Sequence, residues 1–159
     1  MNITILCVGK IKERFYTDAV AEYVKRLGRY AKVNVIEVPD EKTPDNASEA
    51  TEEKIRLTES ERLLAKIKDN MYIIALDLRG QEYDSVAFSE HLDKLMLKGN
   101  SHLAFVIGGS LGLHKSLLSR AQESICFSKM TFPHQLMRVI LCEQLYRACR
   151  IRNGEPYHK

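Results

Sequence analysis

The feature that most constrains this chain is a regular alternation of short apolar runs with longer segments of helical periodicity. The apolar runs cover residues 3–8, 33–38, 72–78, 103–107 and 123–127, and the periodic segments cover residues 13–30, 52–68, 86–97, 114–121 and 133–150. Nearly continuous apolar runs are typical of strands buried on both faces, and strands that alternate with helices form parallel sheets. We therefore predict an α/β fold, a parallel sheet flanked by helices, with an exposed loop at residues 40–50 and a turn at residues 79–81.

Length and composition fit one domain over residues 1–159. The chain is 45% hydrophobic and 28% charged, so it can bury a core. No apolar run approaches the roughly 20 residues that span a bilayer, and the N-terminus lacks the pattern of a signal peptide. The cysteines form no C-x-x-C pair and are predicted to be buried thiols in a reducing compartment: Cys7, Cys126, Cys142 and Cys149. The sequence predicts a cytosolic domain with no membrane partner.

Charge is unevenly distributed, although the net charge is only +3. Residues 128–159 contain six basic and two acidic residues, and residues 10–32 contain seven basic and three acidic residues. Residues 37–61 reverse the balance, with nine acidic and three basic residues. Basic residues gathered in the first helix and at the C-terminal end indicate a local anion-binding face.

A glycine-rich sequence follows the fourth apolar run. Ile107-Gly108-Gly109-Ser110-Leu111-Gly112 places three glycines within five residues at a strand end. Glycine allows positive φ and lets a ligand approach the backbone closely. A tight strand-to-helix turn explains the same residues, and glycine count alone slightly favours it. The sequence matches neither the G-x-G-x-x-G fingerprint nor a P-loop, so neither a Rossmann dinucleotide site nor a nucleoside triphosphatase is supported.

A second candidate segment joins the last strand to the last helix, at residues 127–135. It mixes two aromatic rings, a methionine and small hydroxyls, in the order Phe127-Ser128-Lys129-Met130-Thr131-Phe132-Pro133-His134-Gln135. An adenine-bearing ligand needs flat apolar contacts and backbone hydrogen bonds, and this segment offers both. A loop whose Phe and Met residues fill the core is an equally good explanation. Pro133 is predicted as the first residue of the final helix.

The final helix is apolar around much of its circumference, which indicates that more than one face is buried. In a domain this small, the second face is expected to meet another subunit; a helix central to its own fold is the alternative. Arg138, Arg147 and Arg150 interrupt the apolar surface and are either paired or available to an anionic substrate. The tail Glu155-Pro156-Tyr157-His158-Lys159 carries groups that can stack on a base and handle protons, although most such tails are disordered.

Several chemistries lack their residues. There is no H-E-x-x-H, and His91, His102 and His114 are scattered without metal-ligand spacing, so no metal site is predicted. There is no G-x-S-x-G motif of a serine hydrolase. Asp77 ends a strand, where an aspartate is more often a turn or cap residue than an acid or base.

Taken together, the motifs resemble a known family. They occur in order along the chain as residues 5–10 (Ile-Leu-Cys-Val-Gly-Lys), 105–112 (Phe-Val-Ile-Gly-Gly-Ser-Leu-Gly), 128–134 (Ser-Lys-Met-Thr-Phe-Pro-His), 145–148 (Leu-Tyr-Arg-Ala) and 156–159 (Pro-Tyr-His-Lys). The chain is similar, from end to end, to the small bacterial SPOUT-class methyltransferases that modify N3 of a pseudouridine in the 23S RNA of the large ribosomal subunit.

This resemblance implies features beyond those that periodicity predicts. The sheet would carry a C-terminal deep trefoil knot, although most chains are unknotted. S-adenosylmethionine would lie in the knot against Leu76, Gly108, Phe127, Ser128, Lys129, Met130, Thr131 and Phe132. A homodimer would form through the last helix, and the partner's tail would complete each active site.

The implied reaction transfers a methyl group to a base nitrogen that first has to lose a proton, so a base or a bridging water is needed. His134, or His158 from the partner subunit, is the candidate base, and Arg138 is the candidate to hold phosphate or stabilise an anionic uracil ring. With few basic residues beyond two patches, the protein is expected to act on an assembled ribosome rather than on free RNA.

Two rival functions use the same residues. A nonenzymatic RNA-binding or ribosome-binding module would use the basic faces alone and would not need the glycine turn. A flavodoxin-like binder of flavin or nucleotide follows from fold class only. Binding of S-adenosylmethionine separates both from a methyltransferase.

Overall fold

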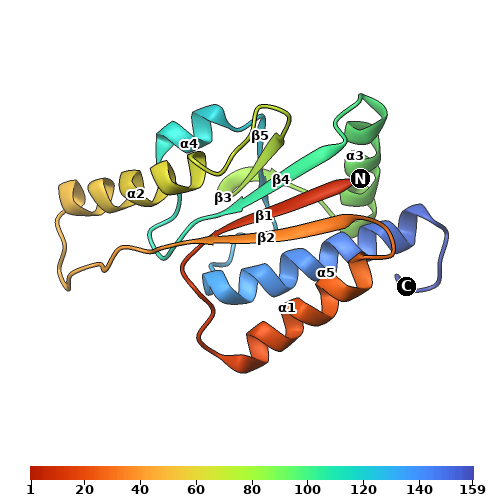
Figure 1. The fold of residues 1–159 in the computed structure, drawn as a ribbon, viewed down its shortest axis with the longest axis horizontal. Coiled ribbons are helices and arrows are strands. Elements are labelled where there is room, and N and C mark those ends of the chain that lie inside the picture. The colour runs from red at the N-terminus through yellow and green to blue at the C-terminus, as the bar shows by residue number, and fades with distance from the viewer.

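The computed structural model describes residues 1–159 as one five-stranded, entirely parallel sheet with helices on both faces (Figure 1). The strand order is β2-β1-β4-β3-β5. The strands are β1 (Asn2–Val8), β2 (Lys32–Val38), β3 (Tyr72–Glu82), β4 (His102–Ile107) and β5 (Glu123–Cys126). The helices are α1 (Arg14–Leu27), α2 (Glu49–Leu64), α3 (Ser85–Leu97), α4 (Lys115–Arg120) and α5 (His134–Arg152). The predicted α/β class is confirmed.

Two hydrophobic clusters, one on each face of the sheet, explain why the central strands β1 and β4 are almost entirely apolar. Side chains alternate between the faces of a strand. In β1, Ile3, Ile5 and Cys7 pack into the cluster beneath α1, α3 and α5, whereas Leu6 and Val8 pack into the cluster beneath α2 and α4. Both faces of β1 are therefore buried, as its unbroken apolar run predicts.

The predicted turn at residues 79–81 is wrong, because β3 continues to Glu82. Two parts of β3 pair with the same residue: Leu76 and Gln81 are both aligned with Ile125 of β5, and the register shifts between them. A Cβ atom at Gly80 would lie only 2.6 Å from the backbone of Ile125. Residues 77–80 therefore bulge out of the strand and return to it, with glycine at the point of closest approach.

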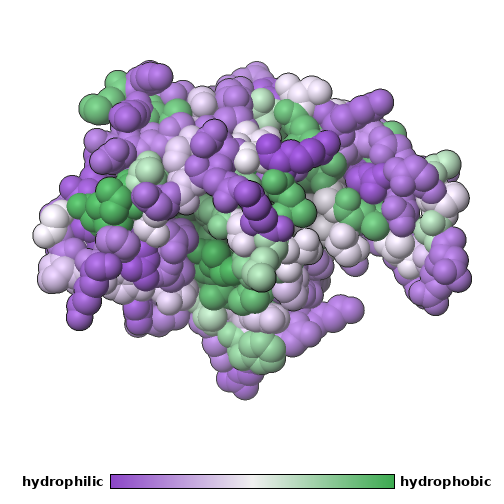
Figure 2. All heavy atoms as spheres, turned by 180° about the vertical axis from the view of Figure 1, so that it is seen from behind, coloured by the Kyte–Doolittle hydropathy of each residue, from purple (hydrophilic) through white to green (hydrophobic).

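The last helix differs from its prediction in two details. Pro133 lies just before α5 as its N-cap, and the helix continues to Arg152. Its buried residues face its own fold, against α1, α3 and the sheet, so part of its apolar surface is explained within the subunit. Leu136, Ile140 and Ile151 remain only partly buried. Figure 2 shows an apolar patch, surrounded by hydrophilic residues, on the face opposite to that of Figure 1.

All four cysteines are free and buried, as the sequence predicts. Burial raises the pKa of the Cys7 and Cys142 thiols to about 12 and that of the Cys149 thiol to about 11. Because the thiolate is the nucleophilic form, these groups are inert near neutral pH. None of the helices is long and apolar enough to cross a membrane.

Candidate active site

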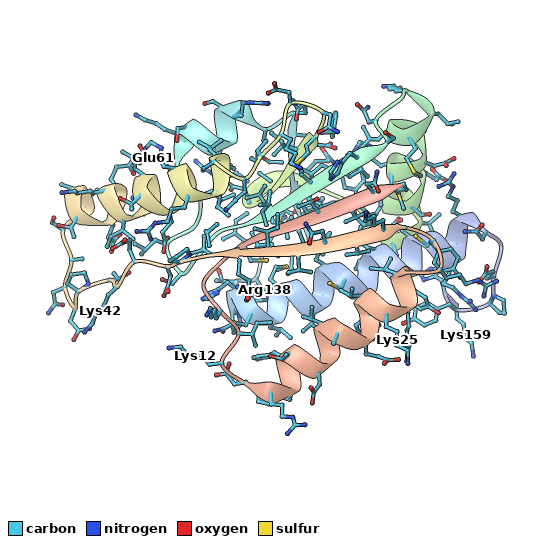
Figure 3. All side chains as sticks on the ribbon, in the orientation of Figure 1. Lys12, Lys25, Lys42, Glu61, Arg138 and Lys159 are labelled. Carbon is cyan, nitrogen blue, oxygen red and sulfur yellow. The ribbon has the colours of Figure 1, made fainter.

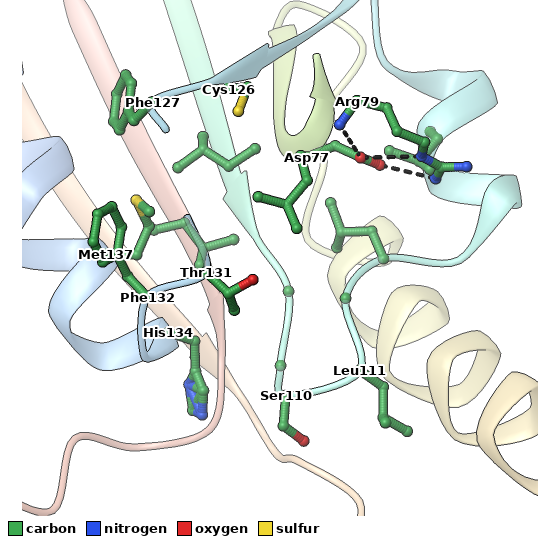
Figure 4. Close-up of a pocket in the computed structure, with 18 of the residues that line it drawn as sticks. Asp77, Arg79, Ser110, Leu111, Cys126, Phe127, Thr131, Phe132, His134 and Met137 are labelled. Atoms are coloured by element: carbon green, nitrogen blue, oxygen red, sulfur yellow. Dashed lines mark hydrogen bonds and ion pairs between the residues drawn. The ribbon is translucent and has the colours of Figure 1, made fainter. Parts of the chain in front are cut away.

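A cavity of about 1150 Å³ opens at the carboxyl edge of the sheet, where β3, β4 and β5 end (Figure 4). Ligands of parallel α/β sheets bind at this edge. The lining combines the bulge of β3, the glycine turn after β4, the segment after β5 and the first residues of α5. Of its 25 lining residues, 12 are hydrophobic, so the cavity suits a ligand with both an apolar and a polar part.

The glycine turn forms the wall of the cavity that follows β4. A Cβ atom at Gly108 would lie 2.8 Å from the backbone of Gly112, so no larger residue fits there without moving the turn. Gly112 has a φ of +82° and donates its N–H to the carbonyl of Gly109 at 3.1 Å. The turn is therefore closed by its own backbone, and the absence of side chains leaves its peptide groups accessible from the cavity.

The segment after β5 faces the glycine turn. Phe127, Ser128, Met130, Thr131 and Phe132 line the cavity. The ring of Phe127 also packs edge-on against Phe88 at 5.7 Å between centroids, so this residue both fills the core and lines the cavity. Met130 is 73% exposed at the rim.

Local hydrogen bonds hold this segment in shape. The thiol of Cys126 donates to the carbonyl of Ser128 at 3.0 Å, and the hydroxyl of Ser128 accepts from the N–H of Met130 at 3.0 Å. Lys129 does not line the cavity; it is exposed, and its amino group lies 4.0 Å from Glu82. Of the predicted cofactor-binding residues outside this segment, Leu76 and Gly108 both line the cavity.

His134 begins α5 and lines the same cavity. Its Nδ1 atom is buried and has no hydrogen-bond partner within the chain. Burial, and secondarily the positive charge of Arg138, lower the pKa of His134 below the ordinary 6.5, whereas Asp40 opposes this effect. The imidazole is therefore neutral near pH 7 and can accept a proton from a bound molecule.

Arg138, the residue expected to hold phosphate or stabilise an anion, lies one turn further along α5 and is not among the residues that line the cavity. The residue is 1% exposed, and its Nη1 atom donates to Glu37 at 2.6 Å. Its Nη2 atom donates to the carbonyls of Val8 at 3.0 Å and Gly9 at 2.7 Å. All of its assigned contacts are internal, so within this chain Arg138 joins α5 to β1 and β2.

His158 lies at the opposite end of α5 from His134. It is exposed, and its Nδ1 atom accepts a hydrogen bond from Arg147 at 3.2 Å. Arg147 follows His134 by 13 residues, about 20 Å of helix, so His134 and His158 of one chain do not meet at one site.

Charged residues from α2 and α4 complete the far wall of the cavity, and the sequence did not indicate them. Glu53 and Arg56 of α2 and Lys115 of α4 all line it. Arg56 bonds to Glu49 at 2.8 Å and to Glu53 at 3.1 Å, and the ring of His114 lies 2.8 Å from Glu53. In the sequence Glu53 and Arg56 belong to a helix that is charged throughout, which leaves no local signal that part of it faces a cavity.

Asp77 also lines the cavity, where the bulge of β3 begins. Burial alone would raise the pKa of its carboxyl group, but hydrogen bonds from the backbone and side chain of Arg79 lower it below its usual value (Figure 4). Asp77 is thus ionised and bonds to Arg79 within the bulge of β3, which continues to Glu82 instead of ending at Asp77 as the sequence indicates. No cluster of His, Cys, Asp and Glu that could hold a metal ion occurs in the structure.

These features define a class, an α/β protein that binds an organic ligand at the carboxyl edge of a parallel sheet. The family model described as "Predicted SPOUT methyltransferase" matches residues 1–158, and the chain belongs to this family. Ribosomal RNA large subunit methyltransferase H of Clostridium beijerinckii is 59% identical and that of Clostridium tetani 61% identical, each over all of both chains.

Solved structures agree on the fold. A probable methylase family protein from Haemophilus influenzae aligns with a TM-score of 0.56 at 12% identity, over 99% of this chain and 70% of that chain. A methylase family protein from Neisseria gonorrhoeae aligns with a TM-score of 0.52 at 14% identity, over 99% of this chain and 86% of that chain.

Proposed function

We propose that this protein is an S-adenosylmethionine-dependent methyltransferase that methylates N3 of a pseudouridine in 23S ribosomal RNA. Membership of the SPOUT methyltransferase family and the names of its full-length relatives support methylation of large-subunit RNA. The observation that carries the proposal is the cavity in which the glycine turn, the segment at residues 127–132 and His134 face one another.

The lining fits S-adenosylmethionine. Phe127, Met130 and Phe132 offer apolar contacts to an adenine ring, and the glycine turn offers backbone groups to the polar parts of the molecule. A Cβ atom at Gly108 would clash with the backbone of Gly112, so glycine at this position allows the tight turn that forms this wall of the cavity. The bound cofactor supplies an activated methyl group, so the chain's contribution is largely to position the acceptor; positioning of reactants can lower a barrier by roughly 7–11 kcal/mol.

A proton has to leave N3 of the acceptor base, and His134 is the residue of this chain best suited to take it. Its Nδ1 atom has no partner, it lines the cavity, and its lowered pKa keeps the ring neutral. Tyr157 is not an alternative base, because burial and its hydrogen bond to Glu143 raise the pKa of its hydroxyl to about 12. Arg138 acts here as a positioning residue for the first turn of α5.

A homodimer through α5 would bring His158 of the partner subunit to the cavity. A two-fold axis across an antiparallel pair of α5 helices places the C-terminal end of one beside the N-terminal end of the other. The partly buried Leu136, Ile140 and Ile151 offer apolar surface for such a contact.

The proposal includes a deep trefoil knot in the C-terminal part of the chain. It is supported by the double pairing of β3 with Ile125 and by the 2.6 Å approach of a Cβ atom at Gly80, where residues 77–80 pass close to β5. The substrate partner is the assembled 70S ribosome, since the chain is a single sheet with limited basic surface. The reaction takes place in the cytoplasm, and four free, buried cysteines agree with a reducing compartment.

Two measurements test the proposal. The first incubates the protein and S-adenosylmethionine with 70S ribosomes from a strain that lacks the protein, and mass spectrometry then reads the 23S RNA. A new methyl group on N3 of one pseudouridine is expected, and strong methylation of a short naked hairpin would contradict the ribosome as substrate. The second is calorimetry with S-adenosylmethionine. Micromolar binding is expected, whereas no binding would favour the nonenzymatic RNA module and binding of flavin instead would favour the flavodoxin-like alternative.

A further inference from the structure

The segment between β1 and the first turn of α1, residues 10–16, exposes an aromatic residue that no element of the fold covers. Phe15 is 65% exposed, and its ring lies 4.4 Å from the ring of Tyr16, centroid to centroid, at an interplanar angle of 57°. Tyr16 is partly buried and supports Phe15 from one side. An exposed phenylalanine leaves apolar surface in water, where single exposed residues are common, so its surroundings decide what it means.

The charge around Phe15 is mostly positive. Lys10, Lys12 and Arg14 are all exposed, and Glu13 is the one acidic residue of the segment. The side chain of Arg14 is 92% exposed, and its single ion pair joins its Nε atom to the carboxylate of Asp18 at 3.6 Å. Ion pairs between exposed side chains contribute little to stability. The segment thus presents an aromatic ring flanked by cations that are free to meet an anion.

This segment leaves the sheet directly beside the cavity. Cys7 of β1 is aligned with Ile107 of β4, so the chain enters residues 9–10 next to the start of the glycine turn. The side chain of Val8 would lie 3.2 Å from a Cβ atom at Gly109. The carboxyl ends of β1 and β4 therefore place the segment at residues 10–16 at the same edge of the sheet as the cavity.

The base of the segment is fixed, although its side chains are free. Gly9 has a φ of +80° and donates its N–H to the carbonyl of Val38 at 2.8 Å. Arg138 donates to the carbonyls of Val8 and Gly9, and it lies one turn beyond His134 on α5. One buried guanidinium thus ties the segment at residues 10–16 to the helix that carries the candidate base.

The basic residues at the C-terminal end of α1 differ from those of residues 10–16, because two of them are engaged in ion pairs. Arg26 is paired with Glu22 at 2.9 Å, and Arg29 lies 3.7 Å from Glu155. Arg26 lies 12 residues after Arg14, about 18 Å along α1, and Arg29 follows the end of the helix. Figure 3 shows Lys12 and Lys25 toward opposite ends of α1, with Arg138 closer to Lys12. The structure therefore divides one basic sequence region into a free end beside the cavity and an end partly engaged in ion pairs.

We propose that residues 10–16 form a docking surface for the ribosomal RNA around the acceptor nucleotide. Phe15 stacks on an unpaired base, and Lys10, Lys12 and Arg14 contact phosphates. Unpaired RNA bases are commonly held by stacking on aromatic rings, with basic side chains following the backbone. This inference rests on the proposed function, because it assigns to the same site the surface that holds its macromolecular substrate.

The test compares variants of this segment with matched variants at the opposite edge of the sheet. Leu97 is 80% exposed at the end of α3 and is followed by the exposed Lys98, so this pair reproduces an exposed apolar residue beside a lysine, away from the cavity. Phe15→Ala is compared with Leu97→Ala, and Lys12→Gln with Lys98→Gln. The substrate is 70S ribosomes from a strain that lacks the protein, and S-adenosylmethionine affinity is measured separately by calorimetry.

Phe15→Ala is expected to raise the KM for ribosomes by roughly 5- to 150-fold, the loss of one stacked base, with unchanged affinity for S-adenosylmethionine. Phe15→Leu, which keeps apolar area without an aromatic face, should behave like Phe15→Ala. Lys12→Gln is expected to reduce the slope of log affinity against log salt by about 1. Both control variants should match the wild type.

Each other outcome is decisive. If wild-type protein methylates ribosomes and Phe15→Ala keeps the wild-type KM, the docking surface is wrong while the proposed function stands. If wild-type protein transfers no methyl group, the proposed function itself fails. If sedimentation shows that Phe15→Ala dissociates the protein into monomers, Phe15 lies in a subunit interface and the docking surface is rejected.

Discussion

The two ends of α5 hold histidines in opposite circumstances. At the N-terminal end, His134 is half-buried against the cavity, and its Nδ1 atom has no partner in the chain. At the C-terminal end, His158 is exposed and accepts a hydrogen bond from Arg147. The tail around it is folded back: Glu155 accepts from Tyr30 at 2.5 Å and pairs with Arg150, and the ring of Tyr157 packs edge-on against Tyr146.

This difference indicates that the two ends of α5 have different roles. At the N-terminal end, the atom without a partner belongs to a residue that lines the cavity, His134. At the C-terminal end, the Nε atom of Arg150 also lacks a partner, but Arg150 does not line the cavity and its Nη1 atom is paired with Glu155. Buried polar atoms without partners are uncommon, and of the four in this structure only His134 Nδ1 belongs to a residue that lines the cavity, where a ligand can bond to it. The first end therefore has the character of a binding site, and the second that of a fixed tail offered to another molecule.

The largest expected effect comes from separating the two histidines between subunits. His134→Ala and His158→Ala are each expected to lower kcat for ribosome methylation by about 10²- to 10⁴-fold, the usual contribution of a proton-transfer residue, with S-adenosylmethionine affinity unchanged. A heterodimer of one His134→Ala chain and one His158→Ala chain, isolated by two different tags, should recover about half of the wild-type rate. One of its two sites then combines the unchanged His134 of one chain with the unchanged His158 of the other.

The matched control is a heterodimer of a wild-type chain and a chain that carries both substitutions. If each site uses His134 of one subunit and His158 of the other, both sites of this dimer lack one histidine and it is inactive. An active control combined with an inactive mixed dimer would place both histidines of a site in one chain, and full activity of the homodimer with both substitutions would reject both residues.

The arginines at the two ends should differ in stability. Arg138 is buried and paired with Glu37, so Arg138→Ala leaves polar groups without partners and is expected to destabilise the fold by about 3–5 kcal/mol. Arg150 is more accessible and bonds to Glu155 and Tyr30, so Arg150→Ala is expected to cost about 1–2 kcal/mol. Urea unfolding at one protein concentration measures both. A stable Arg138→Ala variant that only loses methyl transfer would restore a catalytic role to Arg138.

Glycine positions extend the comparison to the opposite wall of the cavity. Gly108→Ala places a Cβ atom 2.8 Å from the backbone of Gly112 and is expected to weaken S-adenosylmethionine binding at least about tenfold, a cost of about 1.4 kcal/mol or more. Gly99→Ala is the control: Gly99 has a φ of +93° with open space around it, so alanine there strains the backbone far from the cavity. Calorimetry should detect weaker S-adenosylmethionine binding only for Gly108→Ala, whereas both variants are expected to have a lower Tm than the wild type.

The sequence predicts those parts of the fold that depend on local pattern. Apolar runs identify all five strands, most clearly β1 and β4, which are buried on both faces, whereas the edge strand β2 is mostly only partly buried. Glycines mark the turn after β4 because a side chain does not fit at Gly108. The extension of β3 to Glu82 is not predicted, since residues 79–81 have the composition of a turn and pair with β5 only in three dimensions.

For the candidate site as well, the sequence indicates the parts that consist of consecutive residues and not the parts that are brought together from distant positions. Residues 127–132 are contiguous in the sequence, and all of them except Lys129 line the cavity, so a single sequence motif identifies this wall. The internal contacts of Arg138 join residues about 100 and 130 positions apart in the chain, and no spacing within α5 indicates them. Glu53 and Arg56 reach the cavity only because α2 packs against α4, β1 and β2, which a charged helical sequence does not reveal.

The smallest expected effect is a shift in the pH dependence of kcat/KM. It tests whether His134 is the titrating base without replacing either histidine. A base works when deprotonated, and burial and Arg138 lower the pKa of His134; the acid limb of kcat/KM should therefore lie below the ordinary 6.5. Asp40 raises the pKa of His134, so Asp40→Asn should move that limb to still lower pH, whereas Asp45→Asn, on the same exposed loop, should not. An acid limb above 6.5 that ignores Asp40 would mean that His134 is not the titrating base.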